Sequence, residues 1–132
     1  MDRTERVSSR AVDLMMRTST IGGHDVLAAN GEIDLATIPT LHNALVRHAQ
    51  SNRGGTVIVD LDGVTVCDDA GLGVLLGCAG RVRESGGDLV VVCSDGSLRQ
   101  RLARTGFDRA IRVEPSVATV VIGAGAGASP TG

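Results

Sequence analysis

Four aspartates in one short stretch are the side chains best suited to metal or phosphoryl chemistry. Residues 57–77 read Val-Ile-Val-Asp-Leu-Asp-Gly-Val-Thr-Val-Cys-Asp-Asp-Ala-Gly-Leu-Gly-Val-Leu-Leu-Gly. Clustered carboxylates can hold Mg²⁺ in a phosphoryl-acceptor site, but aspartates also form turns and cap helices. The chain has no lysine, so the lysine that assists phosphoryl transfer is missing, which favours turns and caps. The four aspartates are Asp60, Asp62, Asp68 and Asp69.

A predicted strand over 56–61 is followed by an acidic turn and by a helix that begins near Gly71. The free N–H groups of a helix N-terminus carry partial positive charge and can hold phosphate or receive a partner. The residue before this glycine is Ala70, which offers no hydroxyl, base or nucleophile. Gly71, Gly73 and Gly77 are spaced one residue too widely for the dinucleotide fingerprint. With no nucleophile–base pair at this motif, we do not expect an enzyme.

Three cysteines and three histidines offer other kinds of chemistry. Cys67 and Cys93 are predicted at the C-terminal ends of neighbouring parallel strands, which lie about 4.8 Å apart, within disulfide reach. A redox switch is therefore one hypothesis. The alternative is that both, like Cys78, are small buried hydrophobic residues. The histidines lack metal-ligand spacing with the cysteines, so we expect no metal and a surface or turn position for each of them, namely His24, His42 and His48.

Two short motifs carry a resemblance to a known family. In Asp68–Gly73, a strand ends in an aspartate and Gly-Leu-Gly starts a helix. In Gly31–Asp34, the sequence Gly-Glu-Ile-Asp leads into an earlier helix. Together they resemble the STAS domain, the fold of bacterial anti-sigma factor antagonists, over residues 11–122. The resemblance implies an α/β fold with a mixed β-sheet of about five strands and about four α-helices packed mainly on one side.

The resemblance also implies a partner, and Ala70 departs from the family pattern. In members regulated by partner switching, this position is a serine or threonine that the anti-sigma factor, an ATP-using serine kinase, phosphorylates. Phosphorylation adds about −1.5 to −2 charges and releases the complex. Since Ala70 cannot accept phosphate, we expect constitutive binding, or a switch through cysteine redox or phosphorylation of Thr65. Asp69 carries less charge than phosphate and points differently, so we do not expect it to imitate the released state.

The expected role is an anti-sigma factor antagonist that frees a sigma factor by binding its inhibitor. One alternative is a non-phosphorylatable STAS scaffold or sensor subunit of a signalling or transport complex. The other is a small nucleotide-binding module that uses the helix N-terminus near Gly71. The expected partner-binding residues are Gly31, Glu32, Ile33, Asp34, Asp68, Asp69, Ala70, Gly71, Leu72, Gly73 and Gly77.

Hydrophobic periodicity predicts the elements that position these residues. A helix is predicted over 36–50, and Thr37 can cap it. A second helix is predicted to end at Gly86-Gly87. A short helix capped by Ser97 directs Leu98 and Leu102 inward. Its arginines, Arg99, Arg101 and Arg104, are expected outward as a solvated face or docking patch. Strands are predicted at 12–20, 25–30, 56–61, 89–93 and 111–113, and a last helix at 117–122. The apolar stripe of the second helix is Leu72, Leu75, Leu76, Ala79 and Val82.

Composition agrees with one small domain. The chain has 132 residues, of which 42% are hydrophobic, and Phe107 is its one aromatic residue, so Val, Leu, Ile and Ala must form the core. The net charge of −2 predicts no nucleic-acid or membrane surface. No apolar run reaches the roughly 20 residues of a membrane span. We expect a cytoplasmic monomer without cofactor, a loose segment at 1–10 and a disordered Gly/Ala-rich tail at 123–132.

Overall fold

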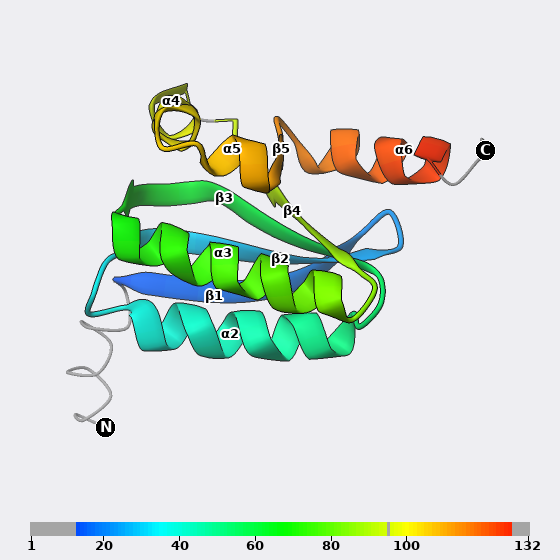
Figure 1. Ribbon diagram of the computed structural model, residues 1–132, viewed down its shortest axis with the longest axis horizontal. Helices are drawn as coiled ribbons and strands as arrows, with labels where there is room; N and C mark the ends of the chain where they lie inside the picture. The colour runs from blue at the N-terminus through cyan, green and yellow to red at the C-terminus, as the bar shows by residue number, and fades with distance from the viewer. Residues whose placement is uncertain (1–12, 95, 128–132) are drawn as a thin grey trace.

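A five-stranded mixed β-sheet organises the protein, as the resemblance predicts. The computed structural model describes residues 13–94 and 96–127, with no account of the side chains beyond 122, so the expected loose segment 1–10 lies outside the described residues. The strand order is β1-β2-β3-β4-β5; β1 and β2 form an antiparallel hairpin and the other pairs are parallel (Figure 1). The strands are β1 (Leu14–Ile21), β2 (His24–Ile33), β3 (Thr56–Cys67), β4 (Asp88–Val92) and β5 (Arg112–Glu114).

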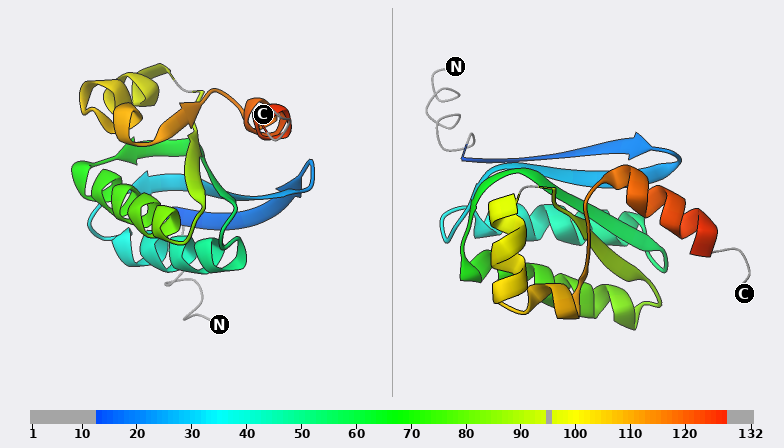
Figure 2. Two further views of the ribbon diagram at one scale, coloured as in Figure 1. Left: turned by 45° about the vertical axis from the view of Figure 1, so that its right-hand side comes forward. Right: turned by 90° about the horizontal axis from the view of Figure 1, so that it is seen from above.

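Four of the helices in the described part of the chain add buried side chains to one core, and the fifth packs on the other face of the sheet. The four helices that share this core are α2, α3, α4 and α5. Figure 2 shows α2 and α3 side by side across one face of the sheet. Val120 of α6 instead packs with Val26, Ile58 and Val90. The helices are α2 (Ile38–Ser51), α3 (Asp69–Glu84), α4 (Gly96–Arg104), α5 (Phe107–Ala110) and α6 (Val117–Gly127).

The main difference from the predicted elements is the length of β3. The prediction of an acidic turn after residue 61 is wrong. Strand β3 continues to Cys67 and pairs with β2 as far as the Ile33–Cys67 pair. The β2–β3 register shifts between Ala28 and Asn30 and again between Gly31 and Glu32. Such irregularities let a long strand bend while it stays paired. Polar residues of β3 therefore do not end it.

Several helical details also differ from the predictions. Helix α2 begins at Ile38, and Thr37 makes no side-chain capping bond to it. Leu76 was expected in the buried stripe of α3 but is 40% exposed, whereas Leu72 and Leu75 are buried. Ser97 lies inside the first turn of α4 rather than before it. Ser116 does cap α6 through the Thr119 N–H (3.1 Å), but α6 continues to residue 127, and residues 128–132 of the expected tail lie outside the described residues.

His48 was expected at the surface, but its side chain is buried between α2 and the sheet. Only 5% of the residue is exposed, and its Nε2 lies 3.1 Å from the Ile58 carbonyl oxygen. Asn52 Nδ2 lies 3.5 Å from its Nδ1. Desolvation lowers the pKa of this imidazole below its ordinary 6.5, despite the opposing effects of the Ile58 carbonyl and of Asp25. His48 is therefore a core histidine whose ring nitrogens have hydrogen-bond partners.

Over the described residues, no helix has the length and apolar character needed to cross a bilayer.

Candidate functional site

The two sequence motifs meet at one edge of the sheet. Strands β2 and β3 are parallel, so their C-terminal ends lie together, and the backbone N–H of Asp68 donates to the Ile33 carbonyl at 3.1 Å. Ile33 is fully buried and lies against the first turn of α3, where a Cβ on Gly71 would collide with its Cγ2. Gly71 is therefore needed for close approach of the helix to the strand. The structure brings Gly31–Asp34 and Asp68–Gly71 into one unit.

The first loop is held by a reciprocal pair of side-chain bonds. Asp34 Oδ1 accepts from the Thr37 N–H (3.2 Å), and Thr37 Oγ1 accepts from the Asp34 N–H (3.0 Å). The same hydroxyl donates to the Glu32 carbonyl oxygen at 2.9 Å. Thr37 thus organises the loop before α2 in the manner of a capping box. Gly31 has φ +121°, and a Cβ there would strike the Asp13 carbonyl, so only glycine fits.

The second loop is short because Asp68 caps α3 directly. Its backbone is extended (φ −89°, ψ 177°) and its carboxylate accepts from the Gly71 N–H at 3.2 Å. One of the free N–H groups at the helix start is therefore already satisfied. A carboxylate here also interacts favourably with the positive end of the helix dipole. This confirms the capping role expected for aspartates in the motif and leaves less of the helix start open to an anion.

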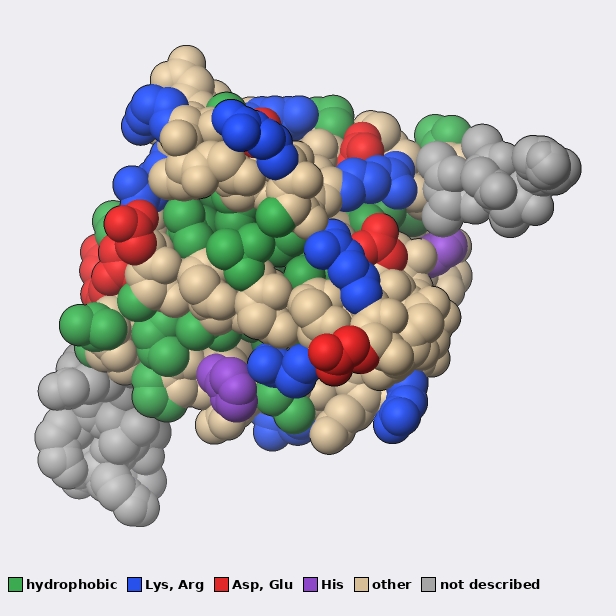
Figure 3. Space-filling model, viewed as in Figure 1, with side chains coloured by type: hydrophobic (Ala, Val, Ile, Leu, Met, Phe, Trp, Pro, Cys, Tyr) green, Lys and Arg blue, Asp and Glu red, His purple; other side chains and the backbone are tan. Residues whose placement is uncertain are grey.

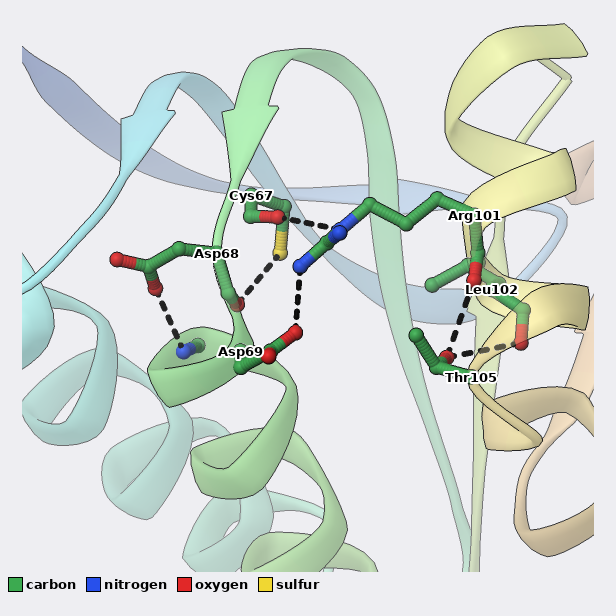
Figure 4. Close-up of polar contacts among 7 residues, drawn as sticks. Cys67, Asp68, Asp69, Arg101, Leu102 and Thr105 are labelled. Carbon is green, nitrogen blue, oxygen red and sulfur yellow. Dashed lines mark hydrogen bonds and ion pairs between the residues drawn. The ribbon is translucent and has the colours of Figure 1, made fainter.

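Arg101 of α4 reaches across to the same junction (Figure 4). Its Nε donates to the Cys67 carbonyl at 2.8 Å, and its Nη2 lies 2.6 Å from Asp69 Oδ1. The neighbouring Arg99 donates to the Cys93 carbonyl at 3.1 Å. The prediction that these two arginines point outward is wrong, since both bind the carbonyls at the ends of β3 and β4. Arg101 lies 32 positions from Asp69 and belongs to no motif, so the sequence carries no signal for this contact.

The residues expected to contact a partner differ in accessibility. Glu32, Asp69, Gly73 and Gly77 are exposed, and Ala70 is half-buried. Three of the expected contact residues are buried and can only position the surface, namely Ile33, Gly71 and Leu72. The others are half-buried, namely Gly31, Asp34 and Asp68.

Sequence reasoning missed two exposed apolar side chains close to the motifs. Leu35 is 76% exposed between the first loop and α2, and Val66 is 47% exposed near the end of β3. A shallow groove beside Asp69 is lined by Leu72 and Leu76 of α3 and by Phe107 of α5. Figure 3 shows hydrophobic side chains gathered between α3 and the α4–α5 region. Exposed apolar residues around a polar junction are typical of protein-binding surfaces.

The four aspartates do not form one cluster. Asp62 accepts from the Ser94 N–H (2.6 Å) and hydroxyl (2.8 Å), and Asp60 accepts from the Asp62 N–H (2.8 Å). Desolvation raises the pKa of Asp60. At the start of α3, Asp68 accepts from the Gly71 N–H and Asp69 pairs with Arg101. Across residues 13–94 and 96–127, no three His, Cys, Asp or Glu side chains are grouped to hold a metal ion.

The three cysteines are buried free thiols. Cys67 has Ile33 as its ladder partner, and the β3–β4 pairing ends at Asp60 and Val92, so Cys67 and Cys93 are not directly opposed across the sheet. Burial raises the pKa of the Cys67 thiol to about 11, against a smaller opposing effect of Arg101. A thiol with so high a pKa is a poor nucleophile. The high pKa argues against a reactive thiol at Cys67, although Cys93 lies near enough to contribute to that pKa.

Comparison with known proteins agrees with this architecture. Residues 15–120 match the family described as the STAS domain. An anti-sigma factor antagonist from Mycobacterium paratuberculosis superposes with a TM-score of 0.73 at 22% identity, covering 84% of this chain and 92% of that chain. An anti-sigma factor antagonist (STAS) domain protein from Planctomyces limnophilus gives 0.69 at 13% identity, covering 81% and 95%. The unphosphorylated anti-sigma factor antagonist SpoIIAA gives 0.61 at 14%, covering 86% and 99%.

Proposed function

Since the chain belongs to the STAS domain family, we propose that it is an anti-sigma factor antagonist. It binds an anti-sigma factor of the ATP-using serine-kinase type and so frees a sigma factor. The observation that carries the proposal is the junction itself, where the Asp68 N–H bonded to the Ile33 carbonyl joins both motifs into one surface beside Ala70. The same role in three structural neighbours supports it. The protein acts by binding, in the cytoplasm, and catalyses no reaction.

The proposed contact surface has a small, weakly polar centre. Ala70, Gly73 and Gly77 lie at helical spacing along α3, and nothing lies within 4 Å of the position that a Cβ on Gly73 would occupy. A partner can therefore approach the helix backbone closely at this face. Leu35, which follows the first loop, and Val66, which pairs with Glu32, have 76% and 47% of their surfaces exposed and supply apolar area at that loop. Burial of such side chains contributes roughly 25 cal/mol per Å² of apolar area.

Ala70 makes this an antagonist without the usual phosphorylation switch. A phosphorylated hydroxyl adds about −1.5 to −2 charges to the contact surface and so opposes binding. Alanine at this position keeps the surface unphosphorylated, so the protein stays competent to bind when its partner holds ATP. Thr65 is the second candidate for a switch, because its exposed hydroxyl donates to the Gly31 carbonyl (3.3 Å) beside the first loop.

An affinity experiment tests the proposal. Purified protein is immobilised and incubated with cytosol of the source organism. It is then washed with ATP and Mg²⁺ in the presence of reductant or, in a separate arm, with mild oxidant and no ATP. The expected result is a serine-kinase-type anti-sigma factor that ATP does not release. Release by ATP would point to Thr65, and release under oxidant alone would point to the cysteines. Recovery of other STAS proteins or transporter subunits without a kinase would contradict the proposal and favour the scaffold role.

A further inference from the structure

We propose that Arg101 keeps the start of α3 electrically neutral by pairing with Asp69, and that this neutrality allows the partner to bind. The inference rests on the proposed function, and it names the residue that holds the same surface in its binding-competent form. Arg101 would act through Asp69 and would itself be a positioning residue, placed on α4 outside both sequence motifs.

The geometry fixes the guanidinium in place. Nε donates to the Cys67 carbonyl (2.8 Å) while Nη2 binds Asp69 Oδ1 (2.6 Å), so two separate anchors orient one planar group (Figure 4). The Arg101 side chain is 33% exposed and that of Asp69 is 87% exposed. An ordinary surface ion pair contributes little to stability, because holding two flexible side chains in one geometry costs conformational entropy. Here the carbonyl bond has already ordered the arginine, which is better suited than lysine to such a fork.

Both carboxylates at the start of α3 have a partner. Asp68 caps the Gly71 N–H, and Asp69 lies against Arg101. Asp69 directly precedes Ala70, the position where phosphorylation would add negative charge. Without Arg101, an uncompensated carboxylate would stand one residue from that position. Unpaired Asp69 would add negative charge to the contact surface and oppose binding, although it carries less charge than phosphate and points differently from residue 70.

A simple tether is the competing explanation, and it makes a different prediction. Arg101 also fastens α4 to the end of β3 through the Cys67 carbonyl. If that bond mattered, Arg101→Gln would weaken binding and removing the Asp69 charge as well would not help. If neutrality matters, Arg101→Gln/Asp69→Asn restores binding although the Cys67 bond is still lost. Arg101→Lys keeps the positive charge without the two-pronged fork and should retain most of the affinity.

The test measures the affinity of these variants for the anti-sigma factor recovered by the affinity experiment. Arg104→Gln serves as the matched control, since it removes the same charge from an exposed position of α4. Calorimetry at low and at high salt gives the dissociation constants, and circular dichroism verifies folding. We expect Arg101→Gln to weaken binding about tenfold at low salt and less at high salt, because salt screens exposed charges. The double variant should bind more tightly than Arg101→Gln alone, and Arg104→Gln should bind within about twofold of wild type.

Two results would overturn the inference while leaving the proposed function intact. One is an Arg101→Gln variant that binds as tightly as wild type; the other is a double variant that binds as weakly as Arg101→Gln. A wild-type protein that binds no serine-kinase-type anti-sigma factor would instead defeat the proposed function and the inference with it.

Discussion

The side chain of Ile33 lies against the backbone of Gly71, so closely that no Cβ fits between them. This contact joins the end of β2 to the first turn of α3 and sets the distance between the two motifs. Gly71→Ala should therefore destabilise the fold by about 1–3 kcal/mol, the usual cost of overpacking a core. Chemical denaturation measures this change in the free energy of unfolding.

Gly73→Ala is the matched control for Gly71→Ala. Both glycines are in α3, but a Cβ at residue 73 would point into open space. Alanine is a better helix former than glycine, so we expect a gain of up to about 1 kcal/mol. Equal losses of stability in both variants would contradict the account given for Ile33 and Gly71.

Restoring a hydroxyl at residue 70 should restore the switch. We expect Ala70→Ser to bind the kinase-type anti-sigma factor as tightly as wild type without ATP, and to be phosphorylated and released with ATP and Mg²⁺. Ala70→Glu places a carboxylate in the contact surface and should weaken binding about tenfold. Phosphate transfer is followed by mass spectrometry and binding by calorimetry. Tight binding of Ala70→Glu would argue against the placement of the contact surface.

The buried His48 should make stability depend on pH. Its pKa is lowered in the folded protein, so the unfolded chain binds protons more readily. The free energy of unfolding should therefore be highest above pH 6.5, the ordinary value, and should fall as the pH drops from 6.5 toward the lowered pKa. Denaturation curves at several pH values would show this slope in wild type and in His42→Asn, whose histidine is exposed. His48→Gln should lack that component of the slope.

The thiol of Cys67 should react slowly in the native protein. With a pKa of about 11, its thiolate fraction at pH 7 is on the order of 10⁻⁴. We expect little alkylation by iodoacetamide, no Cys67–Cys93 crosslink under mild oxidant, and partner binding that oxidant does not change. Mass spectrometry with Cys67→Ser as the reference measures this. A rapid crosslink accompanied by loss of binding would establish the redox switch instead.

The sequence predicted the elements whose signals are local. Motifs beside buried strands identified both loops. The strands predicted at 12–20 and 25–30 form the β1–β2 hairpin, whose turn holds Gly22 and Gly23 with positive φ. The aspartate before Gly-Leu-Gly was expected as a cap, and Asp68 is one. Such features depend on a few adjacent residues, so they can be read without knowing the rest of the fold.

The features that were missed depend on contacts between distant parts of the chain. Asp62 and Gly63 suggested a turn, but pairing of this segment with β2 keeps it in β3. His48 is polar, yet its hydrogen bond with the Ile58 carbonyl makes its burial acceptable. Arg101 has the pattern of a solvated helix residue, and its position over Cys67 and Asp69 follows only from how α4 packs. Local propensity cannot contain that information.

The hydrogen bond between Asp68 and Ile33 has a consequence for the kinetics of recognition. The Asp34–Thr37 pair, the Asp68 cap and this bond hold both loops in one arrangement before any partner arrives. A protein that docks here meets a preformed surface, so little loop entropy is lost on association. Encounter should then proceed as a single bimolecular step without a slower ordering phase. Substitutions that loosen the loops should reduce affinity even when they leave every contacting side chain unchanged.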